Sequence, residues 1–538
     1  MTDTPWGAIS RHTRLVFERA LAQLPFRDGQ DWADVRKGRL ADLPPALSSP
    51  AAPLADLPDE ALHPSLQRIR DLRAVRGLFA VVPGVWQIRN GWRNVTVVAG
   101  DQGRLLIDPP REQRLSEATL RLLDEVLGPQ PVTAVLHSAV AAQQGIGMSV
   151  IDGVVIESLP VVPDGAEPDG ELLRWFPQHG MLHTAGAVAH TLPSVSVEGR
   201  TADPLARAKA LHRALTSYRD ELSVVVGAQD WPTWGSSRSR QVLADGRDLL
   251  RYLHDEVLRL AAAGAGVEEV LAGLQLPPTL TAKWQVRGYD ATLADYAAML
   301  LPRRAEEASG SSALSAASEA RLVHALGSAI EPASVVRTAL DEGDYRAAAE
   351  LGEMLLRVEP TPALGEITAQ AYQQLAFQEE NLVRYQRFTT RSRSLAGDPA
   401  ARAAAPLMPC RAEGTAEELF DLLAVRLHGP RAAGDAFSFP WRVDDDEEQL
   451  LSLRNGVLFA VPVDAATTIA DVEVASSREV LGAIACGHRD AGQALHAGDL
   501  RVTGDLHLFE RFTSLLVAWS CAATGGVPLP DTTRQETP

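Results

Sequence analysis

Three short strand-type runs follow one another from Leu78, and they constrain the fold more than any other feature of the chain. The runs are LFAVVPGVWQIR, NVTVVAG and GRLLIDPP, and Gly or Asn residues separate them. Such β-rich runs between turn residues predict a meander. Residues 111–127 have a helical pattern, and the PVTAVLH run behind them is typical of a buried strand. The sequence therefore predicts a domain in which strands and helices form layers.

The same alternation continues beyond this segment. Further strands are expected at residues 153–158 and 222–227, with a helix between them. Asp203 followed by Pro204 marks the start of that helix, because an N-cap residue before proline is a common helix start. Interleaved strands and helices predict an α/β layered domain over about residues 76–235.

The remaining segments differ in composition. Residues 1–75 are Pro-rich, and we expect them to form an extended arm with an early helix over 13–24. The alternative is full disorder, but the four aromatic residues of this segment argue against it. Residues 239–301 have a helical period, and residues 303–319 form a low-complexity break. Residues 320–395 are again helical and resemble one helical repeat. A single repeat of this kind is more often a scaffold or a dimer face than a peptide-binding array. The last unit, 412–530, is expected to be α+β, with Asn455 and Gly456 as a hairpin turn.

Charge and cysteine content exclude several classes of protein. The formal net charge is −18, which argues against a nucleic-acid groove. Three cysteines lie far apart, so neither a disulfide framework nor a CxxC metal site is expected and a reducing compartment fits best. The N-terminus has no apolar signal region, and the apolar run at 512–523 is too short to span a membrane. These features predict a cytoplasmic protein without a membrane span.

Many segments resemble, in order, the landmarks of the alkyl sulfatases of the metallo-β-lactamase superfamily. They include DGQDWADVRKG, HPSLQR, RGLFAVVPGVWQIR, GRLLIDPP, DWPTWG, LPPTL, VRGYDATLADYAAML, GDYRAAAE, LAVRLHGPRAAG and LRNGVL. The resemblance implies three units after an N-terminal arm at 1–75. These are a metallo-β-lactamase-like αββα sandwich at 76–270, an all-helical dimerisation domain at 271–400, and a sterol-carrier-like α+β domain with an apolar cavity at 412–530.

The family's metal-binding motif is absent from its expected place. The resemblance implies two zinc ions held largely by a THxHxDHxGG loop, but the matching residues here are Ala139, Ala141, Gln143 and Gln144. The glutamate of the next landmark is Gly186, and the His-His pair before WPTWG reads Gln229 and Asp230, so that Glu167 alone keeps its identity. Losing even one residue that supports a metal ligand costs about 10–100-fold in affinity. We therefore predict no metal and no other cofactor.

Several polar residues would remain in the emptied cleft. His190 is the candidate acid or base, with Glu167 or Asp230 as its carboxylate partner, because a histidine beside a carboxylate titrates near neutrality. The alternative is that His190 survives as a fold residue, since the family has a histidine at the matching place. We expect substrate contacts from the following residues: His137, Gln143, Gln144, Arg200 and Tyr289.

Alternatives exist for some of these residues and for the last helix. His137 is also consistent with a structural histidine at a strand end, and Tyr289 with a dimer seam. Asp108, in LLIDPP, is expected to orient loop amides. Leu506, Phe509, Phe512 and Leu516 share one helical face that would line either an alkyl-chain tunnel or a core.

Three functions follow. The first is a metal-free homologue that has lost zinc-dependent hydrolysis and binds an apolar or sulfated small molecule or a partner. The second is an enzyme with metal-independent acid–base chemistry in the cleft, and the third is residual alkyl sulfate hydrolysis. The family's helical domain implies a homodimer, and pairing with an active paralogue would give a heterodimer.

Overall fold

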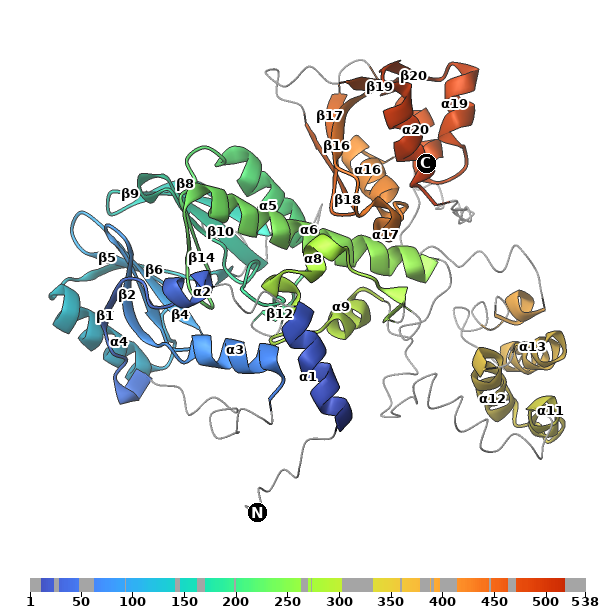
Figure 1. Cartoon of the computed structure of the whole chain (residues 1–538), viewed down its shortest axis with the longest axis horizontal. Helices are drawn as coiled ribbons and strands as arrows, with labels where there is room; N and C mark the ends of the chain where they lie inside the picture. The colour runs from blue at the N-terminus through green and yellow to red at the C-terminus, as the bar shows by residue number, and fades with distance from the viewer. Residues whose placement is uncertain are drawn as a thin grey trace, which may run out of the picture.

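The structure is a computed structural model, and it describes most of the chain. The described residues are 11–23, 29–47, 62–91, 93–140, 146–161, 170–197, 200–262, 270–271, 273–301, 332–358, 360–377, 388, 391–396, 414–444, 447–462 and 471–517. A large α/β unit, a helical unit and an α+β unit follow one another along the chain (Figure 1).

The first sheet of the α/β unit has six strands in sequence order. They are β1 (Arg39–Ala41), β2 (Gly77–Val82), β3 (Val85–Arg89), β4 (Asn94–Ala99), β5 (Arg104–Ile107) and β6 (Val132–Leu136). Neighbours are antiparallel up to β5, and β5 pairs with β6 in parallel because α4 (Gln113–Leu127) forms the crossover between them. The apolar side of α4 packs on this sheet. The predicted meander, helix and buried strand are confirmed.

The second sheet runs β15-β14-β11-β10-β9-β8, with β7 paired to β10. Its strands are β7 (Ala139–Val140), β8 (Gly147–Ile151), β9 (Val154–Val161), β10 (Gly170–Phe176), β11 (Met181–His183), β14 (Val224–Val226) and β15 (Thr233–Trp234). The connections include η3 (Pro177–His179) and the two-stranded β12 (Ser196–Val197) and β13 (Arg200–Thr201). The strands expected at 153–158 and 222–227 are thus β9 and β14.

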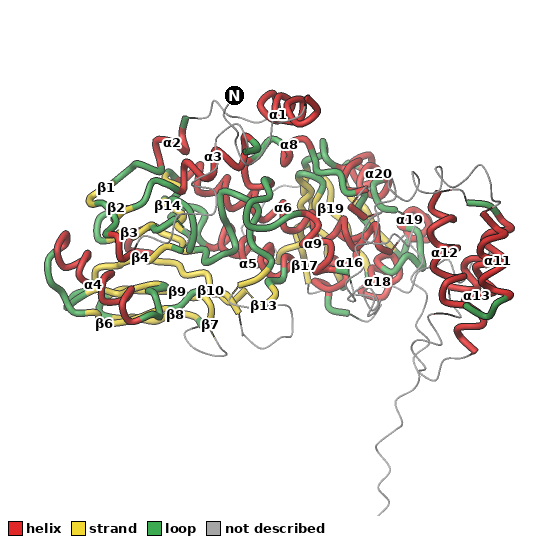
Figure 2. The backbone as a smooth tube through the Cα atoms, turned by 90° about the horizontal axis from the view of Figure 1, so that it is seen from below, coloured by secondary structure: helices red, strands yellow, loops and turns green. Residues whose placement is uncertain are grey.

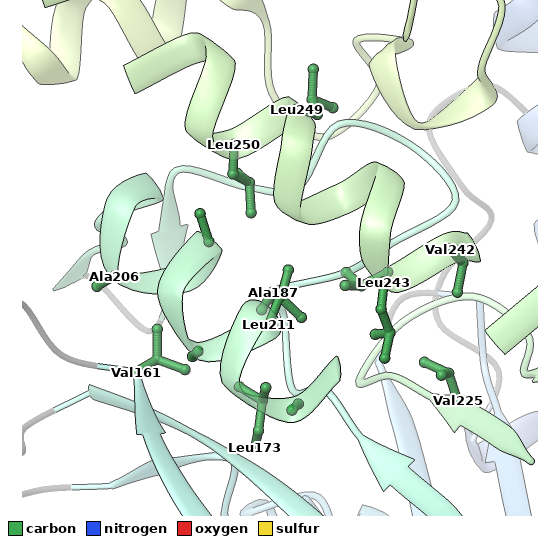
Figure 3. Close-up of a cluster of buried hydrophobic side chains, with 14 of the residues drawn as sticks. Val161, Leu173, Ala187, Ala206, Leu211, Val225, Val242, Leu243, Leu249 and Leu250 are labelled. Carbon is green, nitrogen blue, oxygen red and sulfur yellow. The ribbon is translucent and has the colours of Figure 1, made fainter. Parts of the chain in front are cut away.

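Two helices, α5 (Pro204–Ser217) and α6 (Ser236–Ala262), cover the outer face of the second sheet (Figure 3). The Asp203 side chain accepts a hydrogen bond from the Ala206 N–H at 2.9 Å, which confirms the predicted start of α5. A separate apolar core, which includes Val98, Ile107 and Val226, lies between the two sheets. The layers are therefore α4, sheet, sheet, and α5 with α6, which is the expected αββα sandwich.

The N-terminal arm contributes to this sandwich. Its elements are α1 (Arg11–Gln23), α2 (Gln30–Asp34), β1, η1 (Pro45–Leu47) and α3 (Pro64–Arg73). β1 pairs with β2, and α1 corresponds to the early helix that the sequence predicts. In its described parts, the arm therefore packs on the domain that follows it.

Residues 273–301 also belong to the sandwich by their packing. They contain α8 (Pro278–Thr281), η4 (Trp284–Val286) and α9 (Leu293–Leu300). Leu280, Val286 and Tyr296 share a core with residues of α5 and α6. This packing favours a boundary after Leu301, later than the one expected at residue 270. The low-complexity break at 303–319 lies outside the described residues.

The helical unit contains α11 (Pro332–Asp341), α12 (Tyr345–Val358) and α13 (Pro362–Phe377). These helices pack around a core of their own, and Figures 1 and 2 show them at one end of the molecule. They confirm the helices that the sequence predicts over 320–395.

The last unit has a five-stranded sheet in the order β18-β17-β16-β19-β20. Its elements are α16 (Ala416–Val425), α17 (Gly429–Ala432), β16 (Phe437–Val443), β17 (Glu447–Arg454), β18 (Val457–Pro462), β19 (Val472–Ser476), α18 (Arg478–Ala485), α19 (Ala491–Ala497), β20 (Leu500–Gly504) and α20 (Leu506–Ser514). Asn455 and Gly456 have φ of 53° and 74° in the turn between β17 and β18, so the predicted hairpin is confirmed.

The apolar face of the last helix is divided. Phe509 and Phe512 are buried in the core of the α+β unit, whereas Leu506 is 42% exposed. The sequence predicts one helical face that lines a tunnel or a core. This prediction is wrong for Leu506, which is exposed at the start of α20, and for Leu516, which lies beyond the end of this helix at Ser514. Among the described helices, none combines the length and the apolarity needed to cross a membrane.

Candidate functional site

Three residues with left-handed backbone conformation follow strands of the two sheets. Asp108 follows β5, Ala185 follows β11 and Asp230 lies beyond β14, with φ of 55°, 52° and 60°. Residues other than glycine seldom adopt this conformation, and they concentrate at functional sites. These strand ends are where the sequence places the emptied cleft.

Asp108 binds a residue in the connection that follows β6. Its Oδ1 accepts a hydrogen bond from the Ser138 N–H at 2.7 Å, its Oδ2 accepts one from the Ser138 hydroxyl, and Arg93 Nη2 lies 3.4 Å from Oδ1. Burial alone would raise the pKa of this carboxyl group, but His183 and Arg93 oppose it, and the pKa lies below its ordinary value. The expectation that Asp108 orients a loop amide is confirmed.

A buried histidine that sequence reasoning did not single out lies near Asp108. Burial lowers the pKa of His183 to about 4, although Asp108 acts in the opposite direction. The neutral ring accepts the Ala185 N–H at Nδ1, at 3.3 Å, so its hydrogen is on Nε2. Arg174 lies close by and donates to the His137 carbonyl oxygen at 2.5 Å. An arginine therefore approaches the cleft from the strand beside His183.

Asp230 is held by a second arginine. Arg73 Nε lies 2.6 Å from Asp230 Oδ1, and both terminal nitrogens of Arg73 bind Asp290, at 2.9 and 2.7 Å. Burial alone would raise the pKa of Asp230, but Arg73 and His190 outweigh it, and the pKa lies below its ordinary value. Both carboxylate oxygens of Asp230 are occupied, because Oδ2 accepts the backbone N–H of His190 at 2.9 Å.

The imidazole of His190 has other partners than those predicted. Its Nε2 lies 3.0 Å from the Trp231 carbonyl oxygen, its ring stacks on Trp231, and its Nδ1 lies 3.7 Å from Asp31 Oδ1. Asp230 therefore contacts the backbone of His190 rather than its ring, which corrects the predicted pairing of the ring with Asp230. The nearest carboxylate to the ring in the described part of the chain is Asp31, which also binds Arg68.

Gly186 stands where the resemblance places a glutamate. Its N–H donates to Glu171 Oε1 at 3.0 Å, and Glu171 Oε2 accepts a hydrogen bond from Arg207 Nε at 2.6 Å. The described carboxylates of this cleft, which are Asp108, Glu171 and Asp230, are therefore each paired with an arginine.

The other predicted site residues divide into two groups. Gln143, Gln144 and Glu167 lie outside the described residues, and Arg200 is described only as part of the backbone of β13. His137 follows β6 with its carbonyl bound to Arg174, and Tyr289 lies under the Arg73 guanidinium, 4.5 Å from the ring centre. The structure brings His190, Asp230 and Tyr289 together around Arg73.

A cavity of about 300 Å³ opens beside this group, between α3 and the segment 284–289. Its basic and aromatic lining consists of His63, Arg68, His190, Arg287, Trp284 and Tyr289. Leu66, Ile69 and Val286 add apolar walls. The carboxylates Asp31 and Asp290 lie behind this lining, bound to Arg68 and Arg73. No acidic side chain in the described part of the chain lines the cavity itself.

Two family models match the C-terminal half of the chain. The model of the alkyl sulfatase dimerisation domain matches residues 311–398, and that of the alkyl sulfatase C-terminal domain matches residues 411–520. The chain therefore contains two domains of the alkyl sulfatase family.

Curated relatives extend the similarity to nearly the whole chain. An (R)-specific secondary-alkylsulfatase from Pseudomonas sp is 25% identical and a linear primary-alkylsulfatase from Pseudomonas sp is 26% identical. The alignments cover 93% and 94% of this chain and 91% of each relative. The structure of a stereoselective inverting sec-alkylsulfatase, Pisa1 from Pseudomonas sp., matches with a TM-score of 0.50 at 23% identity, over 96% of this chain and 98% of that one. This last match supports the fold.

The described residues at these strand ends do not fit the two zinc ions that the family resemblance implies. Zinc binds thiolates, imidazoles and carboxylates that are free to coordinate it. A carboxylate that is already paired with an arginine is a poor ligand, because the fixed positive charge repels the zinc ion. The described carboxylates here are paired with arginines. Within the ranges that the structure describes, no three side chains of His, Cys, Asp or Glu come together in a way that could hold a metal ion.

Sequence reasoning missed several residues of this site, although their segments carried a signal. Asp31, Arg68, Arg287 and Asp290 all lie in landmarks shared with the alkyl sulfatases, namely DGQDWADVRKG, HPSLQR and VRGYDATLADYAAML. The resemblance identifies these segments but not the pairing of their charges. That pairing depends on the tertiary structure.

Proposed function

We propose that this alkyl sulfatase family member has lost zinc-dependent hydrolysis and binds a small apolar or sulfated molecule, or a partner. The observation that carries the proposal is the pairing of Asp108, Glu171 and Asp230 with Arg93, Arg207 and Arg73. Arginine stays protonated at all ordinary pH values, so these carboxylates remain neutralised without a metal ion.

The sequence of the cleft supports the same proposal. Ala139 and Ala141 have no ligand atom, and glutamine amides at 143 and 144 are uncharged and poor zinc ligands. Gly186 has no side chain to bind a metal. The fixed positive charge and the missing ligand atoms therefore both disfavour zinc binding.

Zinc analysis of the purified chain tests this proposal. We expect less than about 0.1 zinc ion per chain after incubation with zinc and desalting, and no release of sulfate from an alkyl sulfate such as decyl sulfate. A variant with Ala139→His, Ala141→His, Gln143→Asp and Gln144→His serves as the comparison, and it should retain more zinc. Two zinc ions per wild-type chain, together with sulfate release, would overturn the proposal and favour residual hydrolase activity.

A second candidate is an enzyme with metal-independent acid–base chemistry. It is favoured by one observation, which is that the His190 ring lines the cavity with Asp31 beside its Nδ1. In this case Asp31 takes the role that the sequence analysis predicts for Glu167 or Asp230. The two candidates differ in whether the bound molecule is turned over.

The assembly of the chain is part of the proposal. The match of residues 311–398 to the alkyl sulfatase dimerisation model supports a homodimer. Pairing with a catalytically active paralogue is the alternative assembly, in which this chain would act on its partner. We also propose a cytoplasmic location, because the three cysteines lie far apart in the sequence and fit a reducing compartment.

A further inference from the structure

The cavity between α3 and the segment 284–289 contains a positive charge that has no counter-ion among the described residues. Arg287 Nη2 donates to the Thr281 carbonyl oxygen at 2.8 Å, and its Nε is buried without a hydrogen-bond partner. Burial lowers the pKa of Arg287, which reflects the cost of holding a cation away from water. A ligand that carries negative charge would remove that cost.

Two further groups that line the cavity have unused hydrogen-bonding capacity. Arg68 is 6% exposed, and its Nε has no partner in the described structure, although Nη2 binds Asp31. The Ser65 hydroxyl is also buried without a partner among the described residues. Buried polar groups are nearly always hydrogen-bonded, so these donors indicate that an acceptor completes the site.

The start of α3 also favours an anion in this cavity. Ser65 is in the first turn of this ten-residue helix, where the helix dipole favours an anion. The His63 Nδ1 accepts the Ser65 N–H at 3.3 Å, so the neutral ring carries its hydrogen on Nε2 and can donate it.

The walls of the cavity define the rest of the ligand. Trp284 and Tyr289 are aromatic, and Leu66, Ile69 and Val286 are apolar. A volume of about 300 Å³ is at the small end of the range for ligand pockets, and it suits one ring with its substituent. The chain as a whole is acidic, with a net charge of −18. The lining of this cavity differs from that average, because it contains basic residues and no acidic residue among those described.

We infer that this cavity binds a small aromatic oxyanion, with the anionic group at Ser65, Arg68 and Arg287 and the ring against Trp284 and Tyr289. The inference rests on the proposed function in that the site binds its ligand rather than hydrolyses it. It goes further by naming the class of ligand and by placing it beside the strand-end cleft rather than at the positions of the lost metal ligands.

Calorimetric titration with benzenesulfonate tests the inference. Wild-type protein should bind benzenesulfonate more tightly than its neutral analogue methyl phenyl sulfone, and more tightly than inorganic sulfate. The Arg287→Gln variant should bind it at least about tenfold more weakly, because a charge-assisted hydrogen bond is lost. Ser65→Ala should weaken binding about fivefold, and this second variant keeps the test valid if Arg287→Gln does not fold.

Arg240→Gln is the matched control. Arg240 is an arginine whose Nη1 donates to one carbonyl oxygen, that of Arg219, and it does not line the cavity. Its removal should leave the affinity unchanged. The inference is overturned if wild-type protein does not bind benzenesulfonate, if the neutral sulfone or inorganic sulfate binds as tightly, or if neither cavity variant weakens binding.

Failure of this inference can be distinguished from failure of the proposed function. Two bound zinc ions and sulfate release would overturn the loss of hydrolysis, whatever the affinity of Arg287→Gln. Conversely, the protein could be free of zinc while both cavity variants keep the wild-type affinity for benzenesulfonate. That result would overturn only the site proposed for the oxyanion.

Discussion

Arg73 and Asp230 form a buried ion pair across the strand ends of the sandwich, with 2.6 Å between Nε and Oδ1. The two side chains are 8% and 0% exposed, and Asp290 completes the neutralisation from the opposite side of the guanidinium. In the family's pattern, Asp230 stands where a second histidine precedes the WPTWG segment. One buried guanidinium neutralises two carboxylates at this strand end.

Removing Arg73 should destabilise the sandwich strongly. Arg73→Gln leaves the buried carboxylates of Asp230 and Asp290 without their cation, which costs about 3–5 kcal/mol in the free energy of unfolding. Urea unfolding of wild type and variant measures this difference. Arg39→Gln is the control, because Arg39 pairs with Asp42 on the surface and its loss should cost less than about 1 kcal/mol. Equal effects of the two substitutions would contradict a buried, energetically coupled pair.

The sequence predicted the elements of this region but not the ion pair. Local signals located β5, β6 and α4, because strand runs, turn residues and a helical period are all readable within a few residues. Arg73 lies 157 residues before Asp230 and 217 before Asp290. Nothing in single-sequence periodicity connects positions so far apart, so the pairing became visible only in the folded chain.

The arm and the site of His190 illustrate the same limit. Composition indicated that residues 1–75 form an arm, but not that β1 adds a strand to the first sheet. Likewise, the sequence proposed a carboxylate for the His190 ring but could not select Asp31, which lies in that arm. By contrast, Asn455 and Gly456 were predictable, since a two-residue turn with positive φ has its own local residue preferences.

Acid should destabilise the sandwich through His212. Burial, Arg247 and Arg251 lower the pKa of this histidine to about 3, from an ordinary value of 6.5. Between pH 6.5 and 3 the unfolded chain takes up a proton that the folded chain excludes, so stability is retained above pH 6.5 and decreases as the pH falls. The limiting slope is about 1.4 kcal/mol per pH unit for one proton.

The His212→Asn variant isolates this contribution. Asparagine can still accept the hydrogen bond that Arg247 Nη1 gives to Nδ1 at 2.9 Å, but it does not titrate. Urea unfolding at pH 7.5, 6.5, 5.5 and 4.5 should therefore show a flatter pH dependence for the variant. His507→Asn should keep the wild-type slope, because the His507 side chain is 94% exposed. Parallel slopes for His212→Asn and wild type would show that His212 does not carry the effect.

The hairpin between β17 and β18 should be sensitive to a single methyl group. Gly456 has a φ of 74°, and a Cβ there would lie 2.6 Å from the Gly429 carbonyl oxygen and 3.2 Å from the Tyr252 ring of α6. Gly498 has a φ of 80° with nothing within 4 Å of such a Cβ. Gly498→Ala should cost about 1–2 kcal/mol from backbone strain alone. Gly456→Ala should cost about 1–3 kcal/mol more through overpacking, and equal costs in urea unfolding would contradict close docking of this turn.

Light scattering of the purified chain tests the assembly. A homodimer has twice the chain mass of 57.8 kDa, and we expect this value at micromolar concentration because the dimerisation model matches residues 311–398. A mass of one chain at the same concentration would contradict self-association and favour pairing with a paralogue. Co-expression of the two chains with different tags would then identify a mixed pair.

Substitution of His190 separates binding from catalysis. In His190→Gln the side-chain amide can still donate to the Trp231 carbonyl oxygen, which Nε2 approaches at 3.0 Å, while acid–base chemistry is lost. Because we propose a binding protein, we expect wild type and variant to bind benzenesulfonate within about twofold of each other and to hydrolyse 4-nitrophenyl sulfate at the same background rate. General acid–base catalysis contributes about 100- to 10,000-fold, so a wild-type rate at least 100-fold above that of the variant would favour the enzyme instead. Measuring both quantities on the same preparations ensures that a misfolded variant, which would lose affinity as well as rate, is not mistaken for a catalytic effect.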